Sequence, residues 1–177
     1  MLRMDYYKEK KLVIRNMDLK DIEDICKADG DSSEDNIEYF MSQIERQNNK
    51  EELALLAVCD GKIAGYTFLF YKLKWGGLGH LNLPGIADLV VFHEYRNKGI
   101  ASKLMDVAEK EAARFNNKIY LEVCLNKEYG LAQRMYAKRG YIPDGKGVYY
   151  ESEVCPTDAE CKNDDELTLC LIKELEA

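Results

Sequence analysis

Apolar residues follow two different spacings along this chain, and the spacings predict its helices and strands. In the N-terminal quarter a short apolar run at 12–14 predicts a strand. Apolar residues then recur every three to four positions, which predicts two amphipathic helices separated by a break at 29–31. Asp18 is the expected N-cap of the first helix, and Ser32 or Ser33 opens the second.

The middle of the chain is predicted to hold strands around one long helix. Two strands are joined by the two-residue hairpin turn Asp60–Gly61, and a glycine-rich loop follows them. An almost wholly apolar strand, an amphipathic helix and a further strand come next. Because such strand–helix–strand crossovers join parallel strands, we expect the outer two to be parallel. The expected strands are 53–59, 63–73, 86–92 and 118–125, with the helix near 99–116.

The C-terminal third is predicted to hold one short helix and two strands. The helix at 130–139 ends at Gly140, which is suited to the left-handed cap position. A strand begins at 141 and turns at 143–145, and the last strand is 167–172. The order of elements predicts an α/β fold, of the α+β mixed-sheet kind, antiparallel at first and then with a parallel crossover.

Composition narrows the classes of protein to consider. The 177 residues, 46% of them hydrophobic, suit one domain spanning 1–177. The net charge of −7 argues against a nucleic-acid partner. Two histidines and six cysteines without a C-x-x-C pair argue against a metal site. The charged N-terminus and the lack of about 18 continuous apolar residues predict no signal peptide and no membrane span. A cytoplasmic protein is expected.

The segment 90–104 carries the first chemical signal. A buried strand feeds a short polar loop, which opens directly into the long helix and holds Arg96, Lys98, Gly99 and Ala101. Free N–H groups at a helix start attract anions, and glycine lets a ligand approach the backbone closely. The loop matches neither the Walker pattern nor G-x-G-x-x-G. Taken alone, it fits an ordinary helix start equally well.

The context of this loop resembles a known family. Arg96-x-x-Gly99-x-Ala101 after Leu89-x-Val91 resembles the acyl-CoA loop of the GNAT family, the Gcn5-related N-acetyltransferases.

A second segment also matches that family. The strand near 119–125 ends at Asn126, and a helix through Tyr136 closes at Gly140. The resemblance extends from about residue 10 to the end, and 135–147 with the tail 163–167 is similar to one uncharacterised bacterial subgroup. It implies the family's order of elements, with the central sheet splayed between strands 86–92 and 118–125.

The resemblance implies acetyl-CoA as cosubstrate. The strand before the loop would run beside the pantetheine arm, with a backbone N–H near Val91 facing the thioester oxygen. Residues 96–102 would hold the pyrophosphate, and Asn126 would contact the pantetheine arm. The implied binding residues are Leu89, Val90, Val91, Arg96, Asn97, Lys98, Gly99, Ile100, Ala101, Ser102, Asn126 and Tyr136.

Two residues are the catalytic candidates. Tyr136 matches the family tyrosine that protonates the departing thiolate; alternatively it only packs against the sheet. Asp88 is the only charge in the run 86–92, where burial of an unpaired carboxylate is costly, so it is a candidate base; alternatively loop N–H groups satisfy it. Many relatives carry a glutamate where this chain has Gly85, so Glu122 or a chain of waters is a further candidate for the base.

The predicted activity is N-acetyl transfer from acetyl-CoA to a primary amine, by direct attack through a tetrahedral intermediate. The acceptor is a small-molecule or protein amine. The alternatives are a non-catalytic acyl-CoA-binding sensor and a transferase that uses another acyl-CoA. A homodimer is left open. Acidic and aromatic residues of the first helices and the glycine loop are a candidate acceptor site: Asp29, Asp31, Glu34, Asp35, Tyr71 and Trp75.

Overall fold

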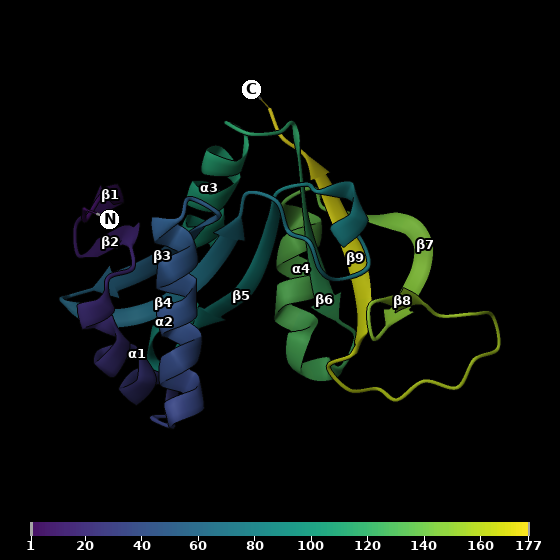
Figure 1. Cartoon of the computed structure of the whole chain (residues 1–177), viewed down its shortest axis with the longest axis horizontal. Helices are drawn as coiled ribbons and strands as arrows, with labels where there is room; N and C mark the ends of the chain where they lie inside the picture. The colour runs from purple at the N-terminus through teal and green to yellow at the C-terminus, as the bar shows by residue number, and fades with distance from the viewer. Residues whose placement is uncertain (1, 177) are drawn as a thin grey trace. The chain divides into compact units, whose positions relative to one another are not determined.

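The chain folds into two compact units, which share one strand. The computed structural model describes residues 2–176 (Figure 1). The first unit contains the chain up to Tyr71 together with Ala87–Glu111, and the second contains Lys72–Ile86 and the chain from Ala112 onward. The hydrogen-bonded strand order is β1-β2-β3-β4-β5-β6-β9-β7-β8.

The first unit is built on an antiparallel ladder. Its strands are β1 (Asp5–Glu9), β2 (Leu12–Asn16), β3 (Glu52–Cys59) and β4 (Lys62–Phe70). Neighbours in this series pair antiparallel. The apolar run of β3 is fully buried from Leu53 to Ala57, and its last two residues are half-buried. The hairpin turn is confirmed, because Asp60 and Gly61 both take positive φ angles, of 51° and 78°.

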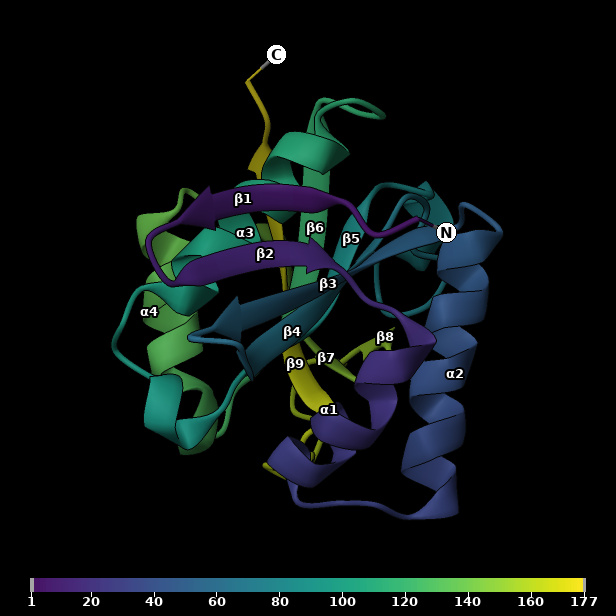
Figure 2. The ribbon, with the colours of Figure 1, turned by 90° about the vertical axis from the view of Figure 1, so that its left-hand side faces the viewer.

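Three α-helices belong to the first unit. They are α1 (Ile22–Asp29), α2 (Glu34–Asn48) and α3 (Ile100–Ala112), and α1 and α2 lie side by side (Figure 2). Asp18 caps a short 3-10 turn, η1 (Leu19–Asp21), that leads into α1, and Ser33 caps α2. Gln47 fixes α2 to the sheet, since its side chain donates to the Met17 carbonyl and accepts from the Ala54 N–H.

The second unit holds the crossover strand and the C-terminal strands. The start of β5 (Gly85–Val91) pairs in parallel with β6 (Lys118–Cys124) at Gly85–Tyr120 and Ile86–Leu121, which confirms the predicted parallel pair. Next to β6 lie β9 (Leu167–Glu174), β7 (Ile142–Tyr150) and β8 (Glu153–Val154), all antiparallel. Helix α4 (Gly130–Lys138) ends before Gly140, whose φ of 85° confirms the left-handed cap.

Short 3-10 turns lie at the ends of several of these elements. They are η2 (Gly79–Leu81), η3 (His93–Tyr95) and η4 (Lys127–Tyr129).

Some predicted boundaries were wrong. The expected turn at 143–145 lies inside β7, where the pairing with β9 shifts between Pro143 and Val148, so it is a bulge that the strand continues through. The strand predicted to reach residue 73 ends at Phe70, and α3 ends at Ala112 instead of 116. Strands β1 and β8 were missed because both are short and polar and lie at sheet edges, where no apolar run marks them. The mixed α/β fold itself is confirmed.

Candidate active site

Asp88 lies at a kink in β5. Its φ of 50° is in the left-handed region, which few non-glycine residues enter and which often marks functional sites. The side chain is exposed, and its carboxylate accepts a hydrogen bond from the Tyr39 hydroxyl. The expectation of a buried carboxylate was wrong, because the kink breaks the alternation of side chains along β5. Asp88 thus combines a strained backbone with access to solvent.

Tyr39 is a protonated donor to Asp88. It stands on α2, and its ring meets the Phe68 ring of β4 edge to face at 5.9 Å between centroids. Burial, and then the negative charge of Asp88, raise the pKa of Tyr39 well above its ordinary value. The hydroxyl therefore keeps its proton at physiological pH and holds the Asp88 carboxylate in one orientation. Sequence reasoning missed this residue, because no motif links Tyr39 to Asp88.

A glycine on β4 allows the strands to approach closely beside the kink. A Cβ atom at Gly65 would lie 2.3 Å from the Val90 carbonyl oxygen and 3.0 Å from the Val91 Cα. Both neighbours are backbone atoms, so they cannot move aside without shifting β5. Gly65 thus sets the position of the predicted cosubstrate strand in the first unit.

Glu52 is a buried acid of the first unit that sequence reasoning missed. Its side chain is 1% exposed, and neither carboxylate oxygen has a hydrogen-bond partner among the described residues. Burial raises the pKa of Glu52 to about 8, although the positive charge of Arg46 opposes the shift. Glu52 begins an apolar strand and follows two other charged residues, and this sequence context is typical of a solvent-exposed strand end.

The predicted phosphate loop has an open, basic surface. Arg96, Asn97, Lys98 and Gly99 are all exposed, and buried Ile100 starts α3. Asn97 and Gly99 have φ angles of 60° and 77°, and a Cβ atom on Gly99 would meet nothing within 4 Å. The Arg96 Nε donates to the Val91 carbonyl at 3.1 Å, which ties the loop to the end of β5. The chemistry of these residues fits a pyrophosphate.

In the second unit Tyr136 is buried on α4. Its side chain is 7% exposed, and its ring meets the Tyr141 ring at 5.8 Å. Burial, followed by the charge of Cys124, raises the pKa of Tyr136 to about 12. Tyr136 is therefore a protonated phenol at neutral pH, which is the state that a proton donor requires.

Asn126 caps the turn that follows β6. Its Oδ1 accepts from the Glu128 N–H at 3.0 Å, and its Nδ2 donates to Asp165 Oδ1 at 2.9 Å. The Gln133 side chain donates to the Cys124 carbonyl at 2.8 Å and so fixes α4 to the end of β6. The predicted site residues thus fall into two groups. Asp88 and the binding residues from Leu89 to Ser102 belong to the first unit, and Asn126 and Tyr136 belong to the second.

Glu122 holds the glycine loop of the second unit. Its Oε1 accepts from the Gly77 N–H and from the Cys170 thiol. Tyr120, two residues earlier on β6, donates to the Trp75 carbonyl at 2.9 Å. The side chain of Glu122 is therefore engaged in loop positioning, which weakens the case for it as the base.

Packing against Leu73 explains why position 85 carries a glycine. A Cβ atom at this position would lie 2.4 Å from Leu73 Cδ2 and 2.7 Å from Leu73 Cβ, and Leu73 is buried. The second unit therefore has no room for a glutamate side chain at this point of β5.

The candidate acceptor residues are dispersed over the two units. Asp29 and Asp31 flank the end of α1, and burial, followed by the charge of Asp31, raises the pKa of Asp29. Glu34 and Asp35 occupy the first turn of α2. Tyr71 belongs to the first unit, and Trp75, which is half exposed, belongs to the second.

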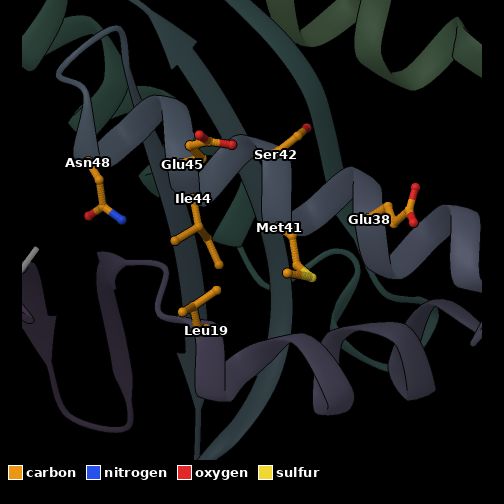
Figure 3. Close-up of a pocket in the computed structure, with 7 residues that line it drawn as sticks. All are labelled: Leu19, Glu38, Met41, Ser42, Ile44, Glu45 and Asn48. Atoms are coloured by element: carbon orange, nitrogen blue, oxygen red, sulfur yellow. The ribbon is translucent and has the colours of Figure 1, made fainter.

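A shallow cavity of about 330 Å³ lies between η1 and α2 (Figure 3). The side chains of Leu19, Met41 and Ile44 point into it, and Glu38, Ser42, Glu45 and Asn48 complete its lining. None of these residues is a predicted site residue, so the cavity is separate from the candidate chemistry. Within residues 2–176, no helix combines the length and the apolar character that crossing a membrane requires.

Comparison with known proteins tests the resemblance to the GNAT family. Residues 17–141 match the model of the acetyltransferase (GNAT) family. An N-alpha-acetyltransferase of Saccharolobus solfataricus is 26% identical over 157 residues, which cover 80% of this chain and 92% of that protein.

Two solved structures share the fold. RimL, a ribosomal alpha-N-protein acetyltransferase, has a TM-score of 0.74 at 11% identity, with 99% of this chain and 96% of RimL covered. The PaiA N-acetyltransferase of Thermoplasma acidophilum, solved in complex with coenzyme A, has a TM-score of 0.64 at 19% identity, with 93% and 99% covered.

The matches confirm the predicted fold, the acetyltransferase activity and the acetyl-CoA cosubstrate. The family match spans most of the chain and includes both the loop at 96–102 and Tyr136. The chain belongs to the acetyltransferase (GNAT) family.

Proposed function

We propose that this acetyltransferase acetylates the α-amino group at the N-terminus of a protein or peptide. The observation that carries this acceptor is the match, along 80% of the chain, to the Saccharolobus solfataricus N-alpha-acetyltransferase. The site chemistry supports the same choice. An α-amino group has a pKa of about 8 and a lysine amine about 10.4, so the α-amine needs less help to lose its proton. That suits a site with Gly85 in place of a glutamate and with Glu122 engaged elsewhere.

Each catalytic candidate has a role in this proposal. Asp88, oriented by Tyr39, accepts the proton that the attacking nitrogen loses. Tyr136 donates its proton to the sulfur as the carbon–sulfur bond breaks, and water restores it. A backbone N–H near Val91 stabilises the oxyanion of the tetrahedral intermediate. Tyr39 acts through Asp88 and is therefore a positioning residue.

Acetyl-CoA is held by the remaining predicted residues. In this proposal the exposed loop at 96–102 binds the pyrophosphate through its N–H groups and basic side chains. The backbone of Leu89, Val90 and Val91 lies along the pantetheine arm, and Asn126 contacts it. When bound, acetyl-CoA supplies the activated acetyl group.

The whole chain, 1–177, is proposed to work as one acetyltransferase domain. The family match at 17–141 includes residues of both units, which supports this proposal. A cytoplasmic protein is also proposed, because all six cysteines are free thiols, as a reducing compartment favours. The homodimer stays a prediction.

The acceptor is tested with three amines that differ in one feature each. One peptide has a free N-terminus and no lysine, a second has a blocked N-terminus and one lysine, and the third amine is a polyamine. Purified protein and acetyl-CoA are added, and thiol release and product mass are measured. We expect acetylation of the first peptide only. Acetylation of only the lysine peptide or the polyamine would overturn the α-amine proposal. If none of the three amines gives thiol release, the result would favour the non-catalytic acyl-CoA-binding sensor.

A further inference from the structure

Two of the six thiols lie close together in the long loop between β8 and β9, far along the chain from the proposed catalytic residues. The Sγ atoms of Cys155 and Cys161 are 2.7 Å apart. Cys161 is exposed and Cys155 is half-buried, whereas Cys26 and Cys170 are buried. A soluble oxidant can therefore reach this pair more easily than the buried thiols.

The backbone brings these cysteines together. The Ala159 N–H donates to the Pro156 carbonyl at 3.1 Å, which closes a turn between the two cysteines. Asp158, at the third position of that turn, has a φ of 65°, a conformation that aspartate tolerates better than most residues. The Cys155 N–H donates to the Val148 carbonyl of β7 at 2.9 Å and anchors one side of the loop. The proximity thus follows from turn and strand hydrogen bonds.

We propose that Cys155 and Cys161 are a redox modification site that closes as an intrachain disulfide. The oxidant is a small-molecule disulfide. One cysteine thiolate attacks it to form a mixed disulfide and release one small thiol, and the second cysteine then displaces the other. The two cysteines lose two protons and two electrons, and the oxidant is reduced to two thiols. A disulfide needs a sulfur–sulfur distance of about 2.05 Å, so the sulfurs must approach only slightly.

The disulfide would restrain a loop whose far end meets the end of β6. Asp165 Oδ1 accepts from Asn126 Nδ2 at 2.9 Å, and the Asp165 carbonyl accepts from the Cys124 thiol at 3.3 Å. Closing the ring from 155 to 161 leaves three residues between Cys161 and Asp165, and the last of them, Asp164, already accepts hydrogen bonds from the Tyr150 hydroxyl and the Leu167 N–H. The oxidation state of the pair therefore sets how freely the loop can leave Asn126.

The experiment detects the bond itself and needs no acetyl transfer, so its failure is distinct from failure of the proposed function. The full chain is incubated with oxidised glutathione, remaining thiols are alkylated, and the protein is cleaved after glutamate. Cleavage after Glu153, Glu160 and Glu166 places the two cysteines in different peptides. We expect peptides 154–160 and 161–166 to appear as one linked pair that separates on reduction.

Single variants test the pairing. Cys155→Ser and Cys161→Ser should each abolish the linked pair and leave the other cysteine carrying glutathione. Cys59→Ser, which removes a half-buried thiol elsewhere, should leave the pair intact. Alkylation of both cysteines after oxidation, a stable glutathione adduct on each, or a disulfide between two chains on a non-reducing gel would each overturn the proposal.

Discussion

At the residue scale, the surroundings of Asp88 in the folded chain differ from those that its neighbours in the sequence indicate. Asp88 was expected to be a buried charge in an apolar strand. Its positive φ instead exposes it to solvent, where the Tyr39 hydroxyl holds its carboxylate. Asp88 stays a candidate for the base, but the reason for choosing it, the burial of an unpaired carboxylate, was wrong.

The first prediction concerns Tyr136. Tyr136→Phe removes the phenol proton but keeps the ring beside Tyr141, so folding should be unaffected. Since a general acid contributes about 10²- to 10⁴-fold, we expect kcat for peptide acetylation to fall roughly 100-fold. Binding of acetyl-CoA, measured by calorimetry, should be unchanged. Tyr141→Phe alters the other ring of the same pair and should leave kcat intact; equal losses in both variants would assign Tyr136 a packing role.

Tyr39 supports a second prediction. Tyr39→Phe removes the hydrogen bond that orients Asp88 and leaves the ring against Phe68. We expect kcat to fall roughly tenfold while the KM for acetyl-CoA is unchanged, because the Asp88 carboxylate loses the donor that holds it in one orientation. Asp88→Asn should lose more, since it removes the base itself. An unchanged kcat in Tyr39→Phe, or a loss that appears only in KM, would argue against a positioning role.

Glu52 makes stability depend on pH. Its folded-state pKa of about 8 lies above the ordinary value of 4.5, so the folded chain holds a proton that the unfolded chain releases between these values. Its contribution is therefore fully present below pH 4.5 and is lost as the pH rises through 8. The full loss is on the order of 5 kcal/mol.

Urea unfolding at pH 5 and pH 8 checks this contribution. Glu52→Gln carries no titrating proton, and we expect the variant to lose less stability than the natural chain between these two pH values. The difference between the two chains isolates Glu52 from other titrating groups. Identical pH dependence in both would mean that Glu52 is hydrated or paired in solution.

At the scale of elements, an ion pair joins strand β2 to the turn that starts α1. The Arg15 guanidinium donates to both oxygens of Asp21, at 2.7 and 2.6 Å, and both side chains are largely buried. Asp21 also accepts from the Asp18 N–H and so completes the capping box of η1. One carboxylate therefore fixes the helix start and its strand together.

We expect Asp21→Asn to be strongly destabilising. Removing one partner of a buried pair leaves the other charge uncompensated, which costs about 3–5 kcal/mol. The free energy of unfolding, measured by urea titration, should fall by about 3 kcal/mol. The exposed pair of Glu23 and Lys27 on α1 is the matched control, and Glu23→Gln should cost under about 1 kcal/mol. Similar losses in the two variants would show that the Arg15 pair is solvated.

Elements with strong apolar patterns were the ones that sequence located correctly. Strand β3, helix α3 and the Gly140 cap lie close to their predicted places, because local spacing or one backbone requirement defines each. The bounds of the other elements depend on which strands pair with one another. Residues 143–145 have turn chemistry, yet β7 pairs with β9 on both sides of them, at Pro143 and again at Val148. They therefore form a bulge within one strand, which only the neighbouring strand could reveal.

At the scale of the molecule, the net charge of −7 gives the chain no general attraction for an anionic cosubstrate. Binding must therefore come from the local loop at 96–102. We expect acetyl-CoA at 100 times its Kd to stabilise the chain by about 2.7 kcal/mol, seen as a raised Tm. Dephospho-CoA and ATP at the same concentration should raise the Tm less. An equal shift with ATP would indicate a general anion site.

The sequence by itself determined the family, the order of the main elements and the candidates Asp88, Tyr136 and the loop at 96–102. The family, the elements and the candidate residues could be found in this way because each depends on local periodicity or on a short motif, and both are formed by residues close together in the sequence. Only the tertiary structure decided that Tyr39 orients Asp88, that Glu122 holds a loop, and that Cys155 meets Cys161. It also left the buried Glu52 carboxylate without a hydrogen-bond partner within residues 2–176. Such contacts depend on strand pairing and packing between distant segments, for which no local pattern exists.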